Sequence, residues 1–411
     1  MTNTNNTNDT TNMADTPDVF TMLTSTAAAG GPTAMFAALA ESLKARQRWH
    51  ALFDLRLLQA RAALGLPTTG DVGTLDPATR DRLDEQSLAA CREVGWPLLD
   101  EGHVAAGWMY LRAAAEPAEV ADKLAALLLR DAPAADDEAA AARLQEIIQI
   151  ALWEGIDPAL GLSAVLASQG TCNSITAYEQ AVSRLPAARQ QQPAGVLLNH
   201  LFRELFQSLA ADLERRVLVP AETIAGTTSI AELLAAGGGL KDDPSFHVDV
   251  SHLQSVLRIA RVCTDRPTIE KAWELAVYGC RLPEEVTYPG EAPFENVAEA
   301  SRLFYGALLG RDVDEALRYF RRAAATARVE ESGTLPADTL VYLLWRLGRP
   351  AEALHAALER PAENGMPSVM QISGMLPSLV ELARQGNALD MLRDACRSRG
   401  DEITFAATFT K

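Results

Sequence analysis

Apolar residues recur at helical spacing along most of the chain. Leu253, Val256, Leu257 and Ala260 stand at positions i, i+3, i+4 and i+7, which places them on one face of an α-helix. The same spacing recurs in segments 144–152 and 197–209. Alternating β-branched residues are almost absent, and 217–219 is the best, short candidate for a strand. The pattern predicts an all-α fold of roughly sixteen helices joined by short loops.

Helix start signals divide this pattern into units of ordinary length. Asp157 followed by Pro158 has the order of an N-cap and a first helical residue. Prolines are expected to open further helices at positions 117, 267, 293, 336 and 350. Ser251 and Gln254 have the spacing of a capping box, so we expect Ser251 to cap a helix that follows it.

A recurrence in the C-terminal third is the clearest sign of internal organisation. Gly310, Gly348 and Gly386 follow one another at intervals of 38 residues, and each is followed by an acidic residue and an apolar segment. Glycine ends a helix readily because it adopts the left-handed conformation at low cost. Each unit is therefore expected to be a helix, a tight turn and a second amphipathic helix. Small residues are expected to let the paired helices approach closely, and these are Ala316, Ala323, Ala353 and Ala357.

These units resemble the tetratricopeptide repeat family. Trp345, Leu347-Gly348 and Ala353 stand about where that motif has its Trp, Leu-Gly and packing Ala, and the resemblance covers about residues 296–400. The period exceeds the usual ~34 residues, and the consensus Tyr and Pro positions are poorly kept. The resemblance implies antiparallel helix pairs stacked as an α-solenoid, or superhelical array, with a concave surface for a protein or peptide. The alternative is an Ala-rich helical bundle with chance similarity.

The sequence also suggests where domains begin and end. Residues 1–19 are rich in Thr and Asn and are expected to form a disordered tail. We expect an N-terminal helical domain over 20–236 and a C-terminal repeat domain over 251–411. The glycine-rich segment 237–250 is expected to be a linker or a pocket loop between them.

Composition excludes several classes of protein. The 37 basic and 54 acidic side chains leave a formal net charge of −17, which argues against a nucleic-acid-binding protein. An apolar content of 48% argues against wholesale disorder. No apolar run is long enough to predict a membrane-spanning helix. Five scattered cysteines without a C-x-x-C pair favour a reducing, cytoplasmic location.

One segment concentrates side chains that carry chemistry. His247, Asp249 and His252 lie within six residues, and His200 and Glu204 have the i, i+4 spacing of a ligand pair on one helix face. Together these five residues form a candidate metal site for Zn²⁺, or for Fe or Mn if further oxygen ligands joined. No H-E-x-x-H motif or relative is present. The alternative is that these are ordinary capping or interface residues.

Two further segments are unusual. The polar stretch Gln169–Ser174 contains Cys172, a nucleophile only if a base lies nearby; helix capping by Thr171 or Asn173 is the favoured interpretation. The loop Tyr288–Phe294 has two prolines around a glycine. It is expected to be a rigid turn, with a pocket rim as the alternative.

Two functions follow from these patterns. The first is a non-catalytic cytoplasmic scaffold that binds a protein or peptide in a groove. The second is a metal-dependent enzyme, of the hydrolase or lyase class, with its site between the helical halves. Because solenoids expose apolar terminal faces, a homodimer through such a face is also expected.

Overall fold

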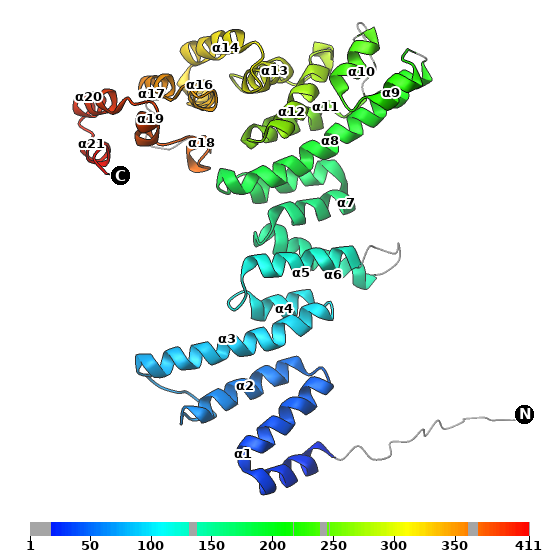
Figure 1. Cartoon of the computed structure of the whole chain (residues 1–411), viewed down its shortest axis with the longest axis vertical. Coiled ribbons are helices and arrows are strands. Elements are labelled where there is room, and N and C mark those ends of the chain that lie inside the picture. Colours follow the sequence, from blue (N-terminus) through cyan, green and yellow to red (C-terminus); the bar gives the residue numbers. More distant parts are fainter. Residues whose placement is uncertain are drawn as a thin grey trace, which may run out of the picture. The chain divides into compact units, whose positions relative to one another are not determined.

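The computed structural model describes residues 18–130, 138–216, 218–238, 245, 247–360 and 369–410. All regular elements in these residues are helices, so the all-α prediction is confirmed (Figure 1). The strand considered at 217–219 is not seen: Leu218 and Val219 lie in a bend, and position 217 is outside the described residues. Of the predicted tail, residues 1–17 also lie outside, and the first helix begins at Val19 with Asp18 as its N-cap.

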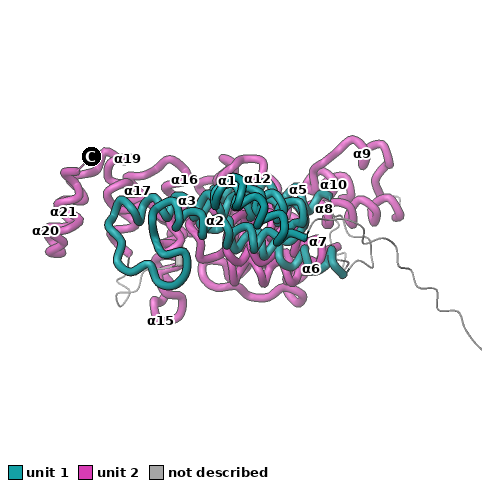
Figure 2. Tube along the Cα trace, turned by 90° about the horizontal axis from the view of Figure 1, so that it is seen from below, with its two compact units in different colours: residues 1–147 teal, residues 148–411 magenta. Residues whose placement is uncertain are grey.

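Contacts within the chain define two compact units, residues 1–147 and 148–411 (Figure 2). The division falls within one helix rather than in the segment 237–250, where the sequence predicts a boundary. Helices on both sides of that segment pack against each other, which explains why no division falls there. Residues 239–244 and 246 are outside the described residues. No helix in the described part of the chain is both long and apolar enough to cross a membrane.

Unit 1 is built from helices that pack against their neighbours in sequence. They are α1 (Val19–Ala45), α2 (Trp49–Ala63), α3 (Pro77–Asp100), α4 (Val104–Leu111), α5 (Pro117–Arg130) and the start of α6 (Glu138–Ile148). Its apolar core includes Leu52, Leu55, Val94, Leu98 and Tyr110, from α2, α3 and α4. Helices α3 and α4 approach closely, because a Cβ at Gly107 would meet the Gly95 carbonyl oxygen at 2.9 Å.

Unit 2 begins with a group of helices around the long helix α8. The elements are the π-helical segment η1 (Gln149–Trp153), α7 (Pro158–Ala177), the π-helical segment η2 (Tyr178–Val182), α8 (Ala187–Arg215), α9 (Ala221–Gly226), α10 (Ile230–Ala236), α11 (Val250–Ile259), the 3₁₀ segment η4 (Ala260–Val262) and α12 (Arg266–Gly279). Helix α8 contacts α7, α10, α11 and α12. Its buried face carries Leu197, Leu201, Leu205 and Leu209, as the helical spacing predicts.

Helix pairs follow in the second half of unit 2. The elements are η5 (Glu284–Val286), α13 (Val297–Leu308), α14 (Val313–Thr326), α15 (Val329–Ser332), α16 (Leu335–Arg346), α17 (Pro350–Glu359), α18 (Val369–Ile372), α19 (Leu379–Gln385), α20 (Leu389–Arg399) and α21 (Glu402–Ala407). Contacts run from α13 to α14, α14 to α16, α16 to α17, α17 to α19 and α19 to α20. Ala316 and Ala353 are completely buried, as expected for packing residues, whereas Ala323 and Ala357 are half-buried.

Most helix starts agree with the sequence signals, and two do not. Asp157 caps α7 through hydrogen bonds from two backbone amides at 3.0 Å, and prolines stand in the first turn of α5, α12, α16 and α17. Pro293 opens no helix, since α13 begins at Val297. The expected capping box at Ser251 is wrong. Helix α11 begins at Val250, and its cap is Asp249, two residues before Ser251. Asp249 accepts from the amides of Ser251 (2.8 Å) and His252 (3.2 Å).

The three glycine turns of the C-terminal third share one hydrogen-bond pattern. The residue in the left-handed conformation donates its amide to the carbonyl three residues back, and the next amide donates to the carbonyl five residues back. Gly310 and Gly348 occupy this position with φ of 83° and 71°. In the third turn Asn387 takes it, with φ of 50°, while Gly386 keeps an ordinary φ of −88°. The same pattern occurs in unit 1 at Gln47 and Gly102, between α1 and α2 and between α3 and α4.

Candidate functional site

His247, the first of the five predicted metal ligands, lies in a buried polar network between α8 and α12. Its Nε2 lies 3.1 Å from the Asp212 carboxylate, and its Nδ1 lies 3.0 Å from the Tyr278 hydroxyl and 3.1 Å from the Arg281 guanidinium. Because a guanidinium only donates, Nδ1 accepts, and a neutral ring carries its hydrogen on Nε2 toward Asp212. Both ring nitrogens are therefore used within the protein. A guanidinium beside the ring also opposes the approach of a divalent cation.

Asp212 is the negative centre of this network. Burial of the carboxylate acts against its ionisation, but hydrogen bonds from His247 and Arg215 and the charge of Arg216 hold its pKa below the ordinary value. The network joins α8 to the segment that leads into α11. Its geometry indicates a structural role.

The other four predicted ligands do not join His247. Asp249 caps α11, and His252 contributes its backbone amide to that cap. His200 lies 3.6 Å from Glu204 on α8, as the i, i+4 spacing predicts, and its Nε2 lies 3.1 Å from the Thr171 hydroxyl on α7. Among the described residues, no three His, Cys, Asp or Glu side chains are grouped so that they could hold a metal ion. A metal-dependent enzyme would therefore lack a set of metal ligands among the described residues.

The polar stretch 169–174 forms a kink within α7. Gly170 has a non-helical conformation with φ of 79°, and the Ser174 hydroxyl donates to its carbonyl at 2.8 Å. The Asn173 side-chain Nδ2 donates to the Gln169 carbonyl at 3.0 Å, back into the preceding turn. Thr171 contacts His200, and Cys172 is exposed.

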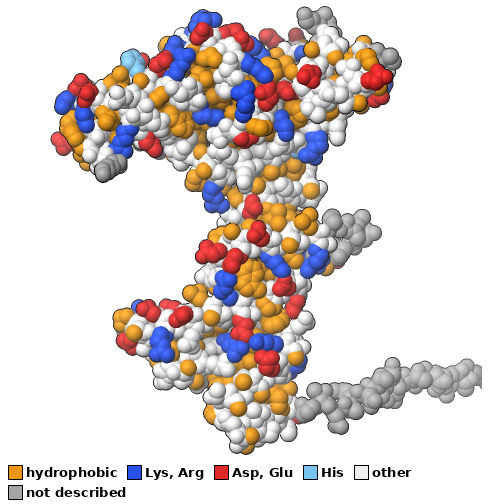
Figure 3. Space-filling model, viewed as in Figure 1, with side chains coloured by type: hydrophobic (Ala, Val, Ile, Leu, Met, Phe, Trp, Pro, Cys, Tyr) orange, Lys and Arg blue, Asp and Glu red, His pale blue; other side chains and the backbone are white. Residues whose placement is uncertain are grey.

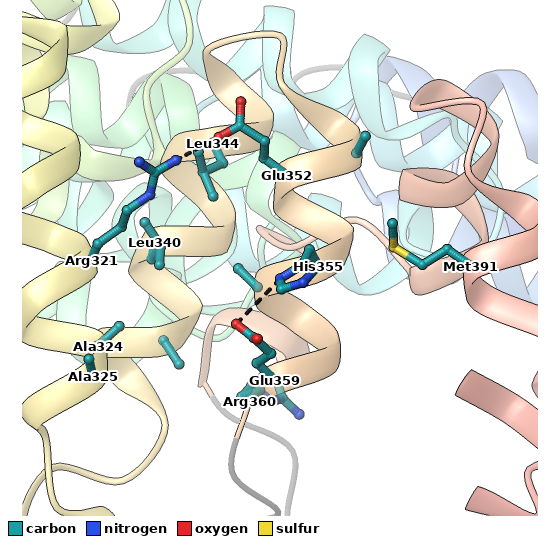
Figure 4. A pocket seen from close by; sticks show the side chains of 13 residues that line it. Arg321, Ala324, Ala325, Leu340, Leu344, Glu352, His355, Glu359, Arg360 and Met391 are labelled. Atoms are coloured by element: carbon teal, nitrogen blue, oxygen red, sulfur yellow. Dashed lines mark hydrogen bonds and ion pairs between the residues drawn. The ribbon is translucent and has the colours of Figure 1, made fainter. Parts of the chain in front are cut away.

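A surface groove of about 640 Å³ lies over the second helix pair of the C-terminal third (Figure 4). Small and apolar side chains form much of its lining. Helix α14 contributes Arg321, Ala324 and Ala325, α16 contributes Ala337, Leu340 and Leu344, α17 contributes Ala351, Glu352, His355, Ala356 and Glu359, and Arg360 and Met391 complete the groove.

The basic side chains of this groove each lie beside a carboxylate. Arg321 bonds Glu352 at 2.6 Å across the groove, and His355 lies 3.3 Å from Glu359 on α17 (Figure 4). Arg360 bonds the buried carboxylate of Asp338 at 2.8 Å. On the face drawn in Figure 3, acidic and basic side chains of unit 2 are interspersed. The groove therefore offers apolar contact rather than a strong charge of one sign.

A second cavity, of about 560 Å³, lies in unit 2. Its lining comes from η2, the start of α8, α11 with η4, the loop 288–294, α13, the segment from Ser332 through α16, and the segment from α18 to Met375. Its apolar lining includes Ile259, Val262, Phe304, Leu335 and Met370, and its polar lining includes Tyr178, Gln190, Arg261, Thr339 and Tyr342. The Ala187 amide donates to the Ser373 carbonyl at 2.6 Å, which attaches the α18 segment to α8.

Arg261 is the unusual side chain of this cavity. Its guanidinium carbon lies 3.3 Å from the ring centroid of Phe294, which is itself buried against Phe304 and Phe320. Its Nε is buried without a hydrogen-bond partner. Within the described residues its guanidinium makes neither a hydrogen bond nor an ion pair. Burial lowers the pKa of Arg261 to about 10, so the side chain stays charged at neutral pH.

The loop 288–294 contributes to the same region. Gln254 holds its backbone through two hydrogen bonds with Tyr288, at 2.7 and 3.2 Å. Tyr288 and Phe294 line a smaller cavity of about 390 Å³ that also touches Arg261. The turn and the pocket rim, which were alternatives in the sequence, therefore occur together.

Sequence reasoning did not single out Arg261. A signal is present, because Arg261 interrupts an otherwise apolar run from Ile259 to Cys263 at the end of an amphipathic helix. A charged side chain at such a position either reaches solvent or is covered by side chains from other helices. The sequence does not distinguish the two, because the partners that bury it come from distant segments.

Comparison with protein-family models, with curated proteins and with solved structures finds no match to this chain. Its function is therefore argued from the groove and the cavity alone.

Proposed function

We propose that this chain is a helical-repeat protein that binds a protein or peptide partner in the groove between α14 and α17, without catalysing a reaction. The proposal rests on the groove itself. Small side chains leave it open, and it lies over α16 and α17, which are joined by the recurring turn at Gly348. A tetratricopeptide-like stack of antiparallel helix pairs would form such a concave surface. The equal turn geometry at Gly310, Gly348 and Asn387 supports that arrangement.

The lining indicates which kind of partner segment fits. Because the cations of the groove are already paired with carboxylates, a strongly acidic peptide gains little there. A segment that presents apolar side chains instead buries them against Leu340, Leu344 and the alanines of α14 and α17. Five free cysteines, all within the described residues, fit a reducing compartment, and we propose a cytoplasmic location.

The experiment introduces a bulky cation into the groove. Ala325→Arg and Ala356→Arg each fill part of the groove from α14 or α17, and Ala211→Arg changes an exposed alanine of α8 that lines no described cavity. A photo-crosslinking residue at Met391, which is 41% exposed at the rim, identifies the partner segment in cells.

We expect both groove variants to weaken binding of that segment by at least about tenfold, because each removes a contact surface worth 1–2 kcal/mol. The Ala211→Arg control should bind like the wild type. The proposal fails if crosslinks form as efficiently from position 211 as from position 391, or if the groove variants bind the segment with unchanged affinity.

A further inference from the structure

Arg261 carries a charge that no side chain in the described residues neutralises. Arg261 is half-buried and its Nε is inaccessible, and a cation in such a place is normally paired with a carboxylate because little water reaches it. Arg261 has no such pair among the described residues, and its Nε has no partner. The other arginine of the same helix end, Arg258, is paired with Glu179 near the cavity mouth. Of the two arginines at this helix end, Arg261 is therefore the one without a carboxylate partner in the described residues.

The contact with Phe294 holds the guanidinium without satisfying it. The ring lies against one face of the guanidinium, at 3.3 Å from its carbon, and this attraction favours a cation at that place. The N–H donors of a guanidinium lie in its plane, so stacking leaves them free. Arg261 lines both the 560 Å³ cavity and the smaller cavity beside the loop 288–294. The two terminal nitrogens are thus oriented by the protein and available to a ligand, whereas Nε is buried.

Charges near the cavity do not supply the missing partner. Glu291 lines the cavity and its charge favours the protonated form of Arg261, but its side chain is exposed and it forms no ion pair with Arg261 within the described residues. Glu179 is already bonded to Arg258. An incoming anion therefore meets one unpaired cation, Arg261, and the exposed carboxylate of Glu291 elsewhere in the lining.

The remaining lining describes the body of the ligand. Phe304, Tyr342, Met370 and Val262 present aromatic and apolar surface, while the Tyr178 hydroxyl is occupied by Gln190 at 3.2 Å. A cavity of 560 Å³ has the size of a typical small-molecule site. A ligand with one anionic group and an apolar body matches both features.

We propose that this cavity binds an organic carboxylate, whose carboxylate group pairs with Arg261 and whose apolar body packs against Phe304, Tyr342 and Met370. A carboxylate presents two oxygens in one plane, which matches the paired N–H donors of a guanidinium. A phosphate monoester carries nearly two charges and gains most from a second cation, but Arg258 is already engaged. The proposal is independent of partner binding in the groove, which involves none of these residues.

The test uses the full chain and the straight-chain carboxylates from butyrate to decanoate. We expect at least one of them to raise the melting temperature of the wild type with saturable concentration dependence, and to bind with one site per chain by calorimetry. Primary amides and alkyl phosphates of the same chain lengths serve as neutral and dianionic controls. The amides should bind at least about tenfold more weakly, because they lose a charge-assisted pair.

Variants assign the effect to Arg261. Arg261→Met should abolish the preference for carboxylate over amide, Arg261→Lys should weaken it, and Arg258→Met should leave it nearly unchanged. Without ligand, Arg261→Met should melt at a temperature equal to or above that of the wild type, because it removes an unpaired charge. This second measurement separates a binding role from a structural one.

Several results would overturn the proposal. If carboxylates and amides bind equally well, the cavity recognises only the apolar body of the ligand. If alkyl phosphates bind more tightly than carboxylates, the cavity is a phosphate site. No response to any carboxylate of the series would contradict it as well. A marked loss of stability in Arg261→Met without ligand would show that Arg261 is a structural residue.

Discussion

Buried polar residues of this chain are satisfied by partners that are distant in sequence. His247 stands out in the sequence, but Asp212 lies 35 residues before it and Arg281 lies 34 residues after it. The histidine content predicts a metal ligand, whereas the surrounding cation and carboxylate explain a structural network. Glu274 on α12 is a second case, since its carboxylate accepts from the Ile230 amide at 2.5 Å and from Ser229 at 3.0 Å, at the start of α10.

The ionisation of Glu274 makes a pH-dependent prediction. Burial raises the pKa of Glu274 above its ordinary value of 4.5, although hydrogen bonds from α10 act against this. A raised carboxyl pKa contributes stability that is complete below the unfolded pKa and is lost as pH rises through the folded pKa. Glu274→Gln imitates the protonated group and does not titrate.

Stability of the Glu274→Gln variant, relative to the wild type, should therefore increase as pH rises from below 4.5 to 7, as measured by urea unfolding at each pH. The matched control is Glu402→Gln, at an exposed position of α21. If the difference in unfolding free energy between Glu274→Gln and the wild type stays constant over this range, burial does not raise the pKa of the Glu274 carboxyl.

Helix pairs of both units are joined by the same turn. Its requirement is one residue in the left-handed conformation, two to three residues before the next helix, and glycine satisfies it at Gly310, Gly348 and Gly102. The third turn of the C-terminal third shows that the requirement is conformational. Here Asn387 takes the position and Gly386 serves a different purpose, because a Cβ at Gly386 would meet the Ala351 backbone nitrogen at 2.6 Å.

Substitutions in these turns should have opposite signs. Gly348→Ala places a Cβ at φ of 71° and should lower the free energy of unfolding by about 1 kcal/mol. Asn387→Gly relieves the same constraint at φ of 50° and should leave stability unchanged or raise it by up to about 1 kcal/mol. Chemical denaturation of both variants checks the order. Equal effects of the two substitutions would show that the left-handed residue is not what these turns require.

The whole molecule consists of two compact units, and one end of unit 2 exposes large apolar side chains. In unit 2, the α21 segment exposes Ile403 (82%) and Phe409 (65%), with Arg393 over the Phe409 ring at 4.4 Å. Large exposed apolar side chains of this kind favour association. The sequence predicts a homodimer through a terminal face, and this segment offers the surface for one.

Light scattering after size-exclusion chromatography should therefore show a dimer of the full chain at micromolar concentration. The double variant Ile403→Glu and Phe409→Glu should be monomeric, because two buried carboxylates oppose association. Leu129→Glu, at an equally exposed apolar position of unit 1, should remain dimeric. A monomeric wild type at ~100 μM, where a stable interface would be saturated, contradicts the prediction.

Local signals in the sequence account for much of the fold. Helical spacing of apolar residues predicts α8 and α11, and Asp157, Pro158 and the glycines at 310 and 348 predict where helices begin and end. These features follow from interactions within a few residues of each other. The errors at Ser251 and Pro293 are also local, because neighbouring residues offered competing caps and turns.

By itself the sequence determined the helical class, most helix starts and the recurring turn, because each depends on backbone preference and on spacing along the chain. Only the tertiary structure decided which polar side chains share an environment. It placed His247 beside Asp212 and Arg281, separated it from His200, and enclosed Arg261 between Phe294 and a cavity. Such environments depend on how helices that are distant in sequence pack together, and residue spacing along the chain does not predict that packing.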